Sequence, residues 1–159
     1  MNWLEHSQDK PILAAARRYG VDPALVKAIV WRESRFHPEA RGHAGEIGLM
    51  QVQGVTAGEW ADAEHNSNFV HEHCLDPVTN TLAGTYYLAK VMRRYARTDN
   101  PPAYALADYN AGRGNVLKWI GGAAATNSET FIAQIGFPGT RDYVRSILAR
   151  RENYRESFK

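Results

Sequence analysis

One glutamate, Glu33, has a spacing that suits acid–base chemistry. The apolar residues Val30, Ile29 and Val26 precede it by three, four and seven positions, which places them on one face of an α-helix with it. A carboxyl group that continues such a core-facing stripe is poorly solvated, so we expect its pKa to rise towards the range of a general acid. The alternative is that the helix is ending and Glu33 turns to solvent or pairs with a neighbouring arginine. Periodicity alone leaves both interpretations open.

The helix that positions Glu33 has a recognisable start and end. Asp22 predicts its N-cap, Pro23 its first position, and we expect it to run to about Phe36. Glu33 then lies in the last turn, where the negative end of the helix dipole also disfavours ionisation. Residues 37–47 contain glycines, a proline and two histidines, which predict a loop or a very short hairpin that returns the chain towards Glu33.

The rest of the chain predicts further helices with short connections. We expect them over residues 9–19, 55–63, 77–97, 101–110, around 116–119, 128–135 and 140–154. Asp9, Ser128 and Thr140 are the predicted caps of the first and the last two. The helix from residue 77 should be the longest, with a buried stripe that begins with Val78 and Leu82.

Length and composition predict one compact domain, residues 1–159, with a core of its own. The chain has 159 residues, of which 44% are apolar, and it contains four tryptophans and eight tyrosines. We expect a mostly α fold with at most a very short β-hairpin near residues 37–52. The net charge of +2 includes no polybasic run of the kind that nucleic acid or an anionic membrane selects, so we expect no nucleic-acid partner.

Cys74 is the only cysteine, so no internal disulfide can form. Three histidines share its irregular segment, residues 64–75: His65, His71 and His73. These side chains can bind zinc, but their spacing fits no common motif, and we expect a polar surface loop without a metal. No stretch has the roughly 18 consecutive apolar residues of a membrane span, and the N-terminus lacks the regions of a signal peptide.

Four separated stretches match one family pattern. The strings ESRFHP at 33–38, GLMQ at 48–51 and YNAG at 109–112 resemble, in order and spacing, the signature of bacterial lytic transglycosylases of the soluble-type (SLT) domain. FIAQIGFPGTRDYV at 131–144 is similar to the C-terminal segment of that family. The resemblance covers nearly all of residues 10–157. It implies a lysozyme-like fold of the goose-type lysozyme and SLT kind, with a cleft for the glycan strands of peptidoglycan.

The resemblance implies that Glu33 is the catalytic residue. It would protonate the oxygen between N-acetylmuramic acid and N-acetylglucosamine, while the acetamido oxygen of the sugar meets the positive charge. The same carboxylate would then take the proton of the muramic acid O6 hydroxyl, which closes a 1,6-anhydro ring. Most glycosidases use two carboxylates, whereas a substrate with two internal nucleophiles requires one. The chemistry implies no cofactor and no metal.

Four further residues would support Glu33 by the same resemblance. Met50 and Gln51 would line the cleft beside the acid. Tyr109 would hydrogen-bond near the catalytic carboxylate or the acetamido group, and Asn110 would shape that corner. The alternative for Tyr109 and Asn110 is a structural role, because buried tyrosine and asparagine side chains commonly satisfy backbone groups.

Glu46 is the second carboxylate that we consider for a hydrolytic muramidase. In goose-type lysozymes, which look like relatives through the same GLMQV string, an aspartate follows that string. Gln53 stands there in this chain and cannot activate water, which favours transglycosylation. A third hypothesis is a catalytically inactive lysozyme-like module that binds glycan or docks into a secretion or cell-wall assembly.

The chain departs from the family pattern at four places, one of which is the absence of the Met-Pro that usually follows the GLMQ string. Gly42 stands where many members have a serine close to the acid, and Glu46 replaces a small residue before GLMQ. Ala133 stands where the C-terminal segment often carries a glutamate. The acid and the tyrosine are intact, so we expect effects on glycan register or efficiency rather than on the reaction class.

The implied substrate also predicts a location. Peptidoglycan lies outside the cytoplasmic membrane, so an enzyme of this class acts in the cell envelope, periplasmic or extracellular, and its export signal is then not part of this sequence. From the residues alone, a cytoplasmic protein is the alternative. We expect a monomer whose partner is the glycan strand. The motifs do not indicate which protein of a cell-wall or secretion machinery could be a further partner.

Overall fold

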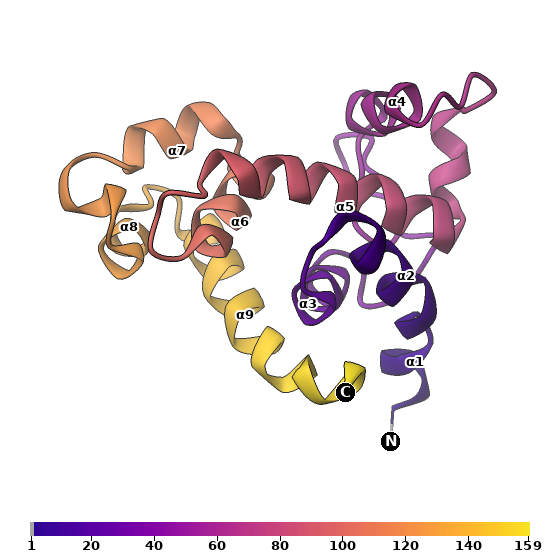
Figure 1. Cartoon of the computed structure of the whole chain (residues 1–159), viewed down its shortest axis with the longest axis horizontal. Helices are drawn as coiled ribbons and strands as arrows, with labels where there is room; N and C mark the ends of the chain where they lie inside the picture. Colours follow the sequence, from indigo (N-terminus) through magenta and orange to yellow (C-terminus); the bar gives the residue numbers. More distant parts are fainter. Residues whose placement is uncertain (1) are drawn as a thin grey trace. The chain divides into compact units, whose positions relative to one another are not determined.

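Helices hold most of residues 2–159, the part of the chain that the computed structural model describes (Figure 1). This confirms the predicted mostly α fold. The chain divides into two compact units: unit 1 is Met1–Tyr87 with Arg151–Lys159, and unit 2 is Leu88–Arg150. The single catalytic domain over residues 1–159 stays a prediction. None of the helices within residues 2–159 has the length and apolarity needed to span a bilayer.

Unit 1 contains the N-terminal helices and the end of the chain. Its elements are α1 (Trp3–His6), α2 (Asp9–Tyr19), α3 (Pro23–Ser34), α4 (Gly54–Ala63), the 3-10 helix η1 (His71–Leu75), the first part of α5 (Pro77–Arg94), the end of α9 (Pro138–Tyr154) and the 3-10 helix η3 (Arg155–Phe158). Helix α3 packs against α2 and η3, and α4 packs against η1.

Unit 2 contains the helices between the end of α5 and residue 150. Its elements are the end of α5, α6 (Pro101–Ala111), α7 (Arg113–Trp119), the 3-10 helix η2 (Gly122–Ala125), α8 (Ser128–Gln134) and most of α9. Helix α6 packs against α7 and α8, and α8 packs against η2. The rings of Tyr95, Tyr104 and Phe131 stack in series, with centroids 5.9 and 4.3 Å apart, and form an aromatic part of this core.

Helix α3 begins where the sequence predicts. Asp22 is its N-cap and accepts a hydrogen bond from the backbone nitrogen of Ala24 at 2.9 Å, and Pro23 is the first helical residue. Residues 24–30 are all buried, so the helix is covered on every side rather than along one stripe. It ends at Ser34, before the predicted Phe36, because Arg35 adopts the left-handed conformation.

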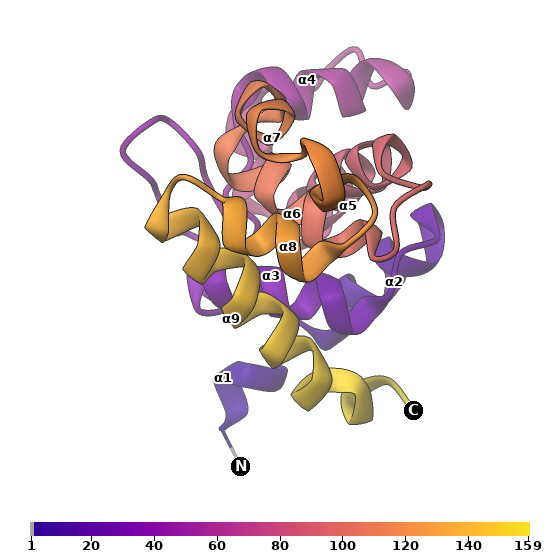
Figure 2. The same cartoon turned by 90° about the vertical axis from the view of Figure 1, so that its left-hand side faces the viewer.

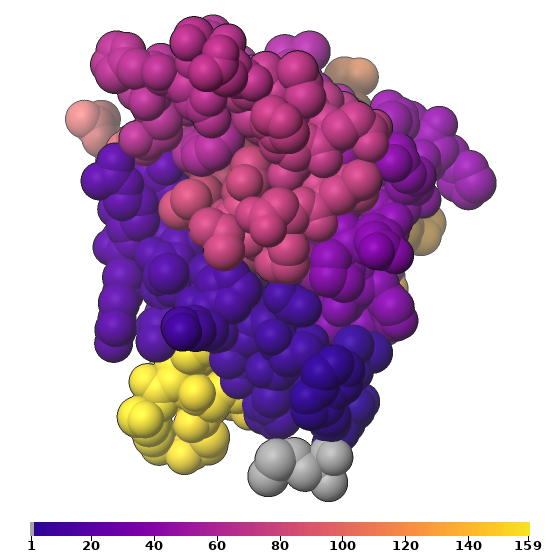
Figure 3. Space-filling model, turned by 90° about the vertical axis from the view of Figure 1, so that its right-hand side faces the viewer, coloured from indigo at the N-terminus to yellow at the C-terminus, as the bar shows by residue number. Residues whose placement is uncertain are grey.

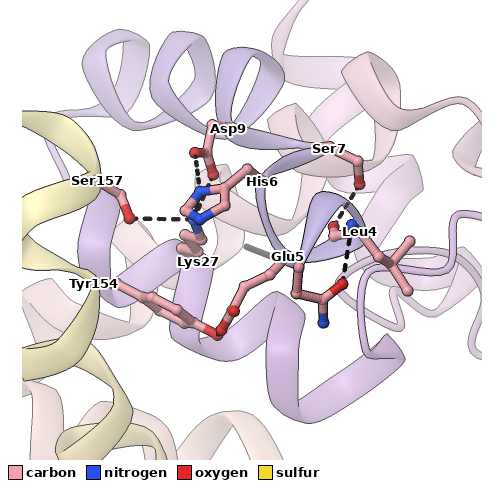
Figure 4. Close-up of polar contacts among 9 residues, drawn as sticks. Leu4, Glu5, His6, Ser7, Asp9, Lys27, Tyr154 and Ser157 are labelled. Atoms are coloured by element: carbon pink, nitrogen blue, oxygen red, sulfur yellow. Dashed lines mark hydrogen bonds and ion pairs between the residues drawn. The ribbon is translucent and has the colours of Figure 1, made fainter.

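A fully buried lysine fastens the two ends of the chain to α3 (Figure 4). The side chain of Lys27 is 0% exposed, and its Nζ lies 2.7 Å from Asp9 Oδ1 and 3.2 Å from Ser157 Oγ. Figure 3 shows the C-terminal segment, in yellow, beside the N-terminal helices, in indigo. Arg151 there pairs with Asp22 at 2.7 Å, and Tyr154 donates to Glu5 at 2.8 Å. A buried charge needs such partners, and the contacts at Asp22 and Lys27 hold the first half of α3 to the two ends of the chain.

Residues 37–53 connect α3 to α4 without a strand of any length. The only β pairing of backbone among the described residues consists of two isolated antiparallel bridges, Arg41 with Ile47 and Ile47 with Val52. Figure 2 shows this segment as a loop between the two helices. The bridges agree with the predicted limit of a very short hairpin near residues 37–52.

Several predicted helix limits are wrong by a few residues. Asp9 is the first residue of α2 rather than its cap, Asn127 rather than Ser128 caps α8, and α9 begins two residues before Thr140. The predicted stripe of α5 is also displaced, because Val78 is 54% exposed. The buried side begins instead with Asn80 and Thr81, whose polar groups bond to backbone carbonyls.

Candidate active site

Glu33 lies in the last turn of α3 and is half-buried. Val26, Ile29 and Val30, the apolar residues that place it on a core-facing stripe, are fully buried. The helix therefore holds the carboxyl group at the margin of the core of unit 1, which suits the predicted environment. Its catalytic role stays a prediction.

The backbone after Glu33 is strained. Arg35 and Phe36 follow each other in the left-handed region with φ of 51° and 66°, which costs about 1–2 kcal/mol per non-glycine residue. The buried ring of Phe36 packs edge-on against Tyr154, with centroids 6.3 Å apart. The guanidinium of Arg35 lies 4.1 Å from the centroid of the Trp31 ring. These contacts offset the strain and fix the conformation of the turn that follows Glu33.

The GLMQ loop at 48–51 is held by an asparagine that the sequence analysis missed. Asn80 is fully buried; its Oδ1 accepts from the backbone nitrogen of Met50 at 2.8 Å, and its Nδ2 donates to Ile47 at 2.9 Å and Cys74 at 2.8 Å. One amide thereby satisfies three backbone groups. The available signal was an asparagine inside a predicted helix, where it is unfavourable unless its side chain has a specific partner.

Gly48 and Met50 show how closely this loop is packed. Gly48 has φ of 80°, and a Cβ there would lie 2.1 Å from Asn80 Nδ2 and 2.4 Å from the Cys74 carbonyl oxygen. Met50 is fully buried, and a Cβ at Gly84 would lie 2.5 Å from its sulfur. Full burial favours a supporting role for the Met50 side chain. Its expected contact with a glycan stays a prediction.

Gln51 ties the GLMQ loop to the segment that follows α3. It has φ of 48°, and its Nε2 donates to the carbonyl oxygens of Ala40 at 3.0 Å and Gly48 at 2.9 Å. Both amide hydrogens are used, while Oε1 keeps its capacity to accept a hydrogen bond from a ligand. The half-buried Gln51 is thus suited to a place beside a ligand, and its role in binding stays a prediction.

Glu46 and Gly42, two departures from the family pattern, lie against each other. The Glu46 carboxylate accepts from the backbone nitrogen of Ala44 at 3.1 Å, and a Cβ at Gly42 would fall 1.6 Å from Glu46 Oε1. The glutamate side chain therefore occupies the space that any side chain at position 42 would require. The absence of a serine at 42 and the presence of a carboxylate at 46 are one structural feature. Whether Glu46 acts on a substrate stays a prediction.

Tyr109 and Asn110 lie near the end of α6 in unit 2. The preceding Asp108 is buried, and it accepts from Tyr95 OH at 2.5 Å and from Arg94 Nη1 at 3.2 Å. Burial, and then this hydrogen bond, raise the pKa of Tyr95. Asp108 thereby anchors the turn from which half-buried Tyr109 and exposed Asn110 project. Their roles stay predictions.

Two of the histidines near Cys74 form hydrogen bonds with backbone groups. His71 Nε2 lies 2.9 Å from the Val52 carbonyl oxygen, and His73 Nδ1 accepts from the Val70 backbone nitrogen at 3.3 Å. Cys74 is buried, which raises the pKa of its thiol to about 11. From residue 2 to residue 159, no three His, Cys, Asp or Glu side chains gather as a metal site requires.

The predicted site residues divide between the units. Unit 1 holds Glu33, Glu46, Met50 and Gln51, and unit 2 holds Tyr109 and Asn110. Within unit 1, hydrogen bonds join the GLMQ loop to the segment after α3. Within unit 2, a hydrogen bond of 2.7 Å joins Asn110 to Thr140, in the C-terminal family string.

Comparisons with known proteins agree with the four motifs. The sequence profile of the family described as "Transglycosylase SLT domain" matches residues 10–132. Membrane-bound lytic murein transglycosylase C of Klebsiella pneumoniae (strain 342) is 40% identical over 110 residues, which cover 65% of this chain and 31% of that protein. The soluble lytic murein transglycosylase of Escherichia coli (strain K12) is 34% identical over 137 residues, 85% of this chain and 21% of that protein.

Solved structures show the same likeness. An inactive mutant of the lytic transglycosylase Slt from Pseudomonas aeruginosa superposes with a TM-score of 0.84 at 27% identity, over 93% of this chain and 24% of that one. A complex of the 70-kDa soluble lytic transglycosylase with bulgecin A gives 0.82 at 29% identity, with the same coverage. The chain spans about a fifth to a third of the length of these relatives. The profile match and these likenesses establish that the chain belongs to the transglycosylase SLT domain family, whose fold is lysozyme-like.

Proposed function

We propose that this chain is the catalytic domain of a peptidoglycan lytic transglycosylase. It cleaves the β-1,4 bond between N-acetylmuramic acid and N-acetylglucosamine and leaves 1,6-anhydromuramic acid ends. The observation that carries the proposal is Glu33, the glutamate of the family motif, at the end of a buried helix and before a strained turn. The names of the relatives, lytic murein transglycosylases, support the substrate and the reaction.

Glu33 acts first as an acid and then as a base. Its proton goes to the glycosidic oxygen as the bond breaks, and the acetamido oxygen of the muramic acid stabilises the anomeric carbon. The carboxylate then takes the proton from the O6 hydroxyl, whose oxygen forms the new bond to that carbon. Glu33 ends protonated, as it began, and no water is consumed. General acid–base catalysis of this kind contributes about 10²–10⁴-fold to a rate.

The other motif residues orient the substrate. Gln51 Oε1 accepts a hydrogen bond from a sugar hydroxyl or amide, and Tyr109 donates near the carboxylate or the acetamido group. Asn110 supplies amide groups at the same corner. The Met50 side chain, which is fully buried, supports the GLMQ loop that carries Gln51. The reaction requires no cofactor or metal.

The substrate places the protein in the cell envelope, as the names of its relatives also suggest. We propose a periplasmic or extracellular location and a monomer that acts on glycan strands without a nucleic-acid partner.

Mass spectrometry of the fragments released from purified peptidoglycan tests the proposal. The unmutated protein should release fragments one water lighter than hydrolysis products, and Glu33→Gln should release none. Glu39→Gln is the matched control, because it changes an exposed carboxylate in the segment that follows α3.

The pH dependence of fragment release is a second test. Activity should fall as pH rises, because the protonated carboxyl of Glu33 starts the reaction. A flat profile from mildly acidic to neutral pH would contradict that role.

A hydrolytic muramidase is the second candidate, and the fixed position of Glu46 favours it. The carboxylate is held by the backbone nitrogen of Ala44 over Gly42, which is the kind of preorganisation that directs a water molecule. Release of reducing-end fragments, lost in Glu46→Gln, would establish hydrolysis. Glycan binding without any release would establish a non-catalytic module.

A further inference from the structure

A buried hydroxyl in unit 2 bonds to an exposed amide on another helix. Thr140, in the first turn of α9, is 4% exposed, and its Oγ1 donates to Asn110 Oδ1 at 2.7 Å. Asn110 itself is exposed and belongs to the last turn of α6. The hydroxyl and the amide come from two of the four family strings, residues 131–144 and 109–112.

This bond decides which side of the amide is available to a ligand. The Asn110 oxygen accepts from Thr140, so the Nδ2 hydrogens are the part of the amide that remains for another partner. Nδ2 makes no hydrogen bond to any residue from 2 to 159, and Asn110 is an exposed residue. Asn110 therefore presents a donor of fixed direction, and such a donor matches an acceptor oxygen.

The contact is not the usual local bond of a threonine in a helix. Hydroxyl groups in a first turn commonly bond to backbone groups of their own helix. Thr140 instead reaches a side chain 30 residues earlier in the chain. The hydroxyl is satisfied by this bond, and its burial keeps competing water away from it. The arrangement holds a rotatable side chain in one orientation, which is the property that a binding residue requires.

We propose that Thr140 is a positioning residue, which holds the Asn110 amide so that Nδ2 donates a hydrogen bond to an acceptor oxygen of the glycan. Carbonyl and hydroxyl oxygens of an N-acetylated sugar both fit this donor. The proposal deepens the function above and rests on it, because it assumes that Asn110 faces the substrate. Its contribution is to binding, whereas that of Glu33 is to the chemical steps.

Binding to a soluble tetrasaccharide of alternating N-acetylglucosamine and N-acetylmuramic acid tests this, in a Glu33→Gln background that does not turn it over. Calorimetry should give a Kd raised about two- to tenfold by Thr140→Val, the range of one hydrogen bond. Thr140→Ser keeps the hydroxyl and should restore the parent Kd. Asn110→Asp keeps the acceptor for Thr140 but removes the donor, so it should weaken binding while thermal stability is retained.

The double variant Thr140→Val with Asn110→Ala distinguishes a positioning role of Thr140 from a general loss of local structure. If Thr140 acts through Asn110, adding Thr140→Val to Asn110→Ala should not raise the Kd further. Parent-like binding by Thr140→Val, or a further loss in the double variant, would overturn the proposal. Parent-like binding by Asn110→Asp would overturn it as well.

The proposed function fails by a different result. If the protein with Glu33 intact releases no fragments from peptidoglycan, the transglycosylase assignment is wrong, while the Kd pattern above still establishes the role of Thr140. If fragments are released and the Kd pattern is absent, only the role of Thr140 is wrong.

Discussion

The two units hold their motif residues by different means. In unit 1 the GLMQ loop has almost no regular backbone pairing, and the side chains of Asn80 and Gln51 take up backbone groups that a helix or sheet would satisfy. In unit 2, Tyr109 and Asn110 stand on a regular helix whose end is anchored by buried Asp108. Irregular backbone needs a specific polar partner for each buried group, whereas a helix satisfies itself. Unit 1 is therefore more sensitive to single substitutions.

Gly48 and Gly112 give the largest expected contrast. Both have positive φ, 80° and 88°, but a Cβ at Gly48 would meet Asn80 and the Cys74 carbonyl, while a Cβ at Gly112 meets nothing within 4 Å. Gly112→Ala should cost about 1–3 kcal/mol of unfolding free energy, from backbone strain alone. Gly48→Ala adds steric overlap and should cost at least about 4 kcal/mol. Urea denaturation measures both, and equal costs would remove the contrast.

Removing the anchor of the loop should have the next largest effect. Asn80→Ala leaves three buried backbone groups without their partner, at about 1–3 kcal/mol each before relaxation, so we expect a loss of about 3 kcal/mol or more. Asn115→Ala is the matched control in unit 2, where the side chain, on α7, donates one hydrogen bond to the carbonyl oxygen of Ala111 at the end of α6. It should cost about 1 kcal/mol or less. Hydrogen exchange at the Met50 amide should accelerate in Asn80→Ala alone.

A buried thiol in unit 1 and a buried phenol in unit 2 should lower the free energy of unfolding over different ranges of alkaline pH. Burial raises the pKa of Cys74 in unit 1 to about 11 and that of Tyr104 in unit 2 to about 12. Unfolded thiols lose their proton from about pH 8.5 and unfolded phenols from about pH 10. Stability is thus full below these values and falls as pH rises to the folded pKa, because the unfolded state deprotonates first.

Between pH 9 and 10 the largest contribution from a single group should come from Cys74, at up to about 1.4 kcal/mol per pH unit, because unfolded phenols are then only partly deprotonated. Cys74→Ala should reduce the slope of the unfolding free energy against pH over that interval more than Tyr104→Phe does. Denaturation at pH 8, 9 and 10 provides the measurement. A slope that is unchanged in Cys74→Ala would refute this assignment.

The smallest effect is expected at Gly42. A side chain there displaces the end of the Glu46 side chain rather than backbone, so Gly42→Ser should cost less than about 1 kcal/mol, the worth of the bond between Ala44 and Glu46. In a Glu46→Ala background the same substitution should cost almost nothing. A double-mutant cycle measures this coupling. No coupling would mean that the two departures from the family pattern are independent.

Caps and apolar spacing predicted the helices that carry the motifs. They did not predict the side-chain contacts that hold those helices and loops in place. The cap at Asp22 located the start of α3 and put Glu33 in its last turn, because capping depends on residues adjacent in the sequence. The stripe of α5 that apolar spacing predicts is wrong at its start, because Val78 is exposed and Asn80 is buried. An asparagine is buried only when its partners are present, and those partners lie in another segment.

The sequence by itself determined the helical class, the family and the identity of the candidate acid. These depend on the spacing of neighbouring residues and on short strings that keep their order. Only the tertiary structure decided that Asn80 holds the Met50 amide and that Thr140 holds Asn110, each across 30 positions of the chain. It also decided that Glu46 fills the space above Gly42. Such pairs form because folding brings distant polar groups together in a core that excludes water, and no local pattern specifies which groups meet.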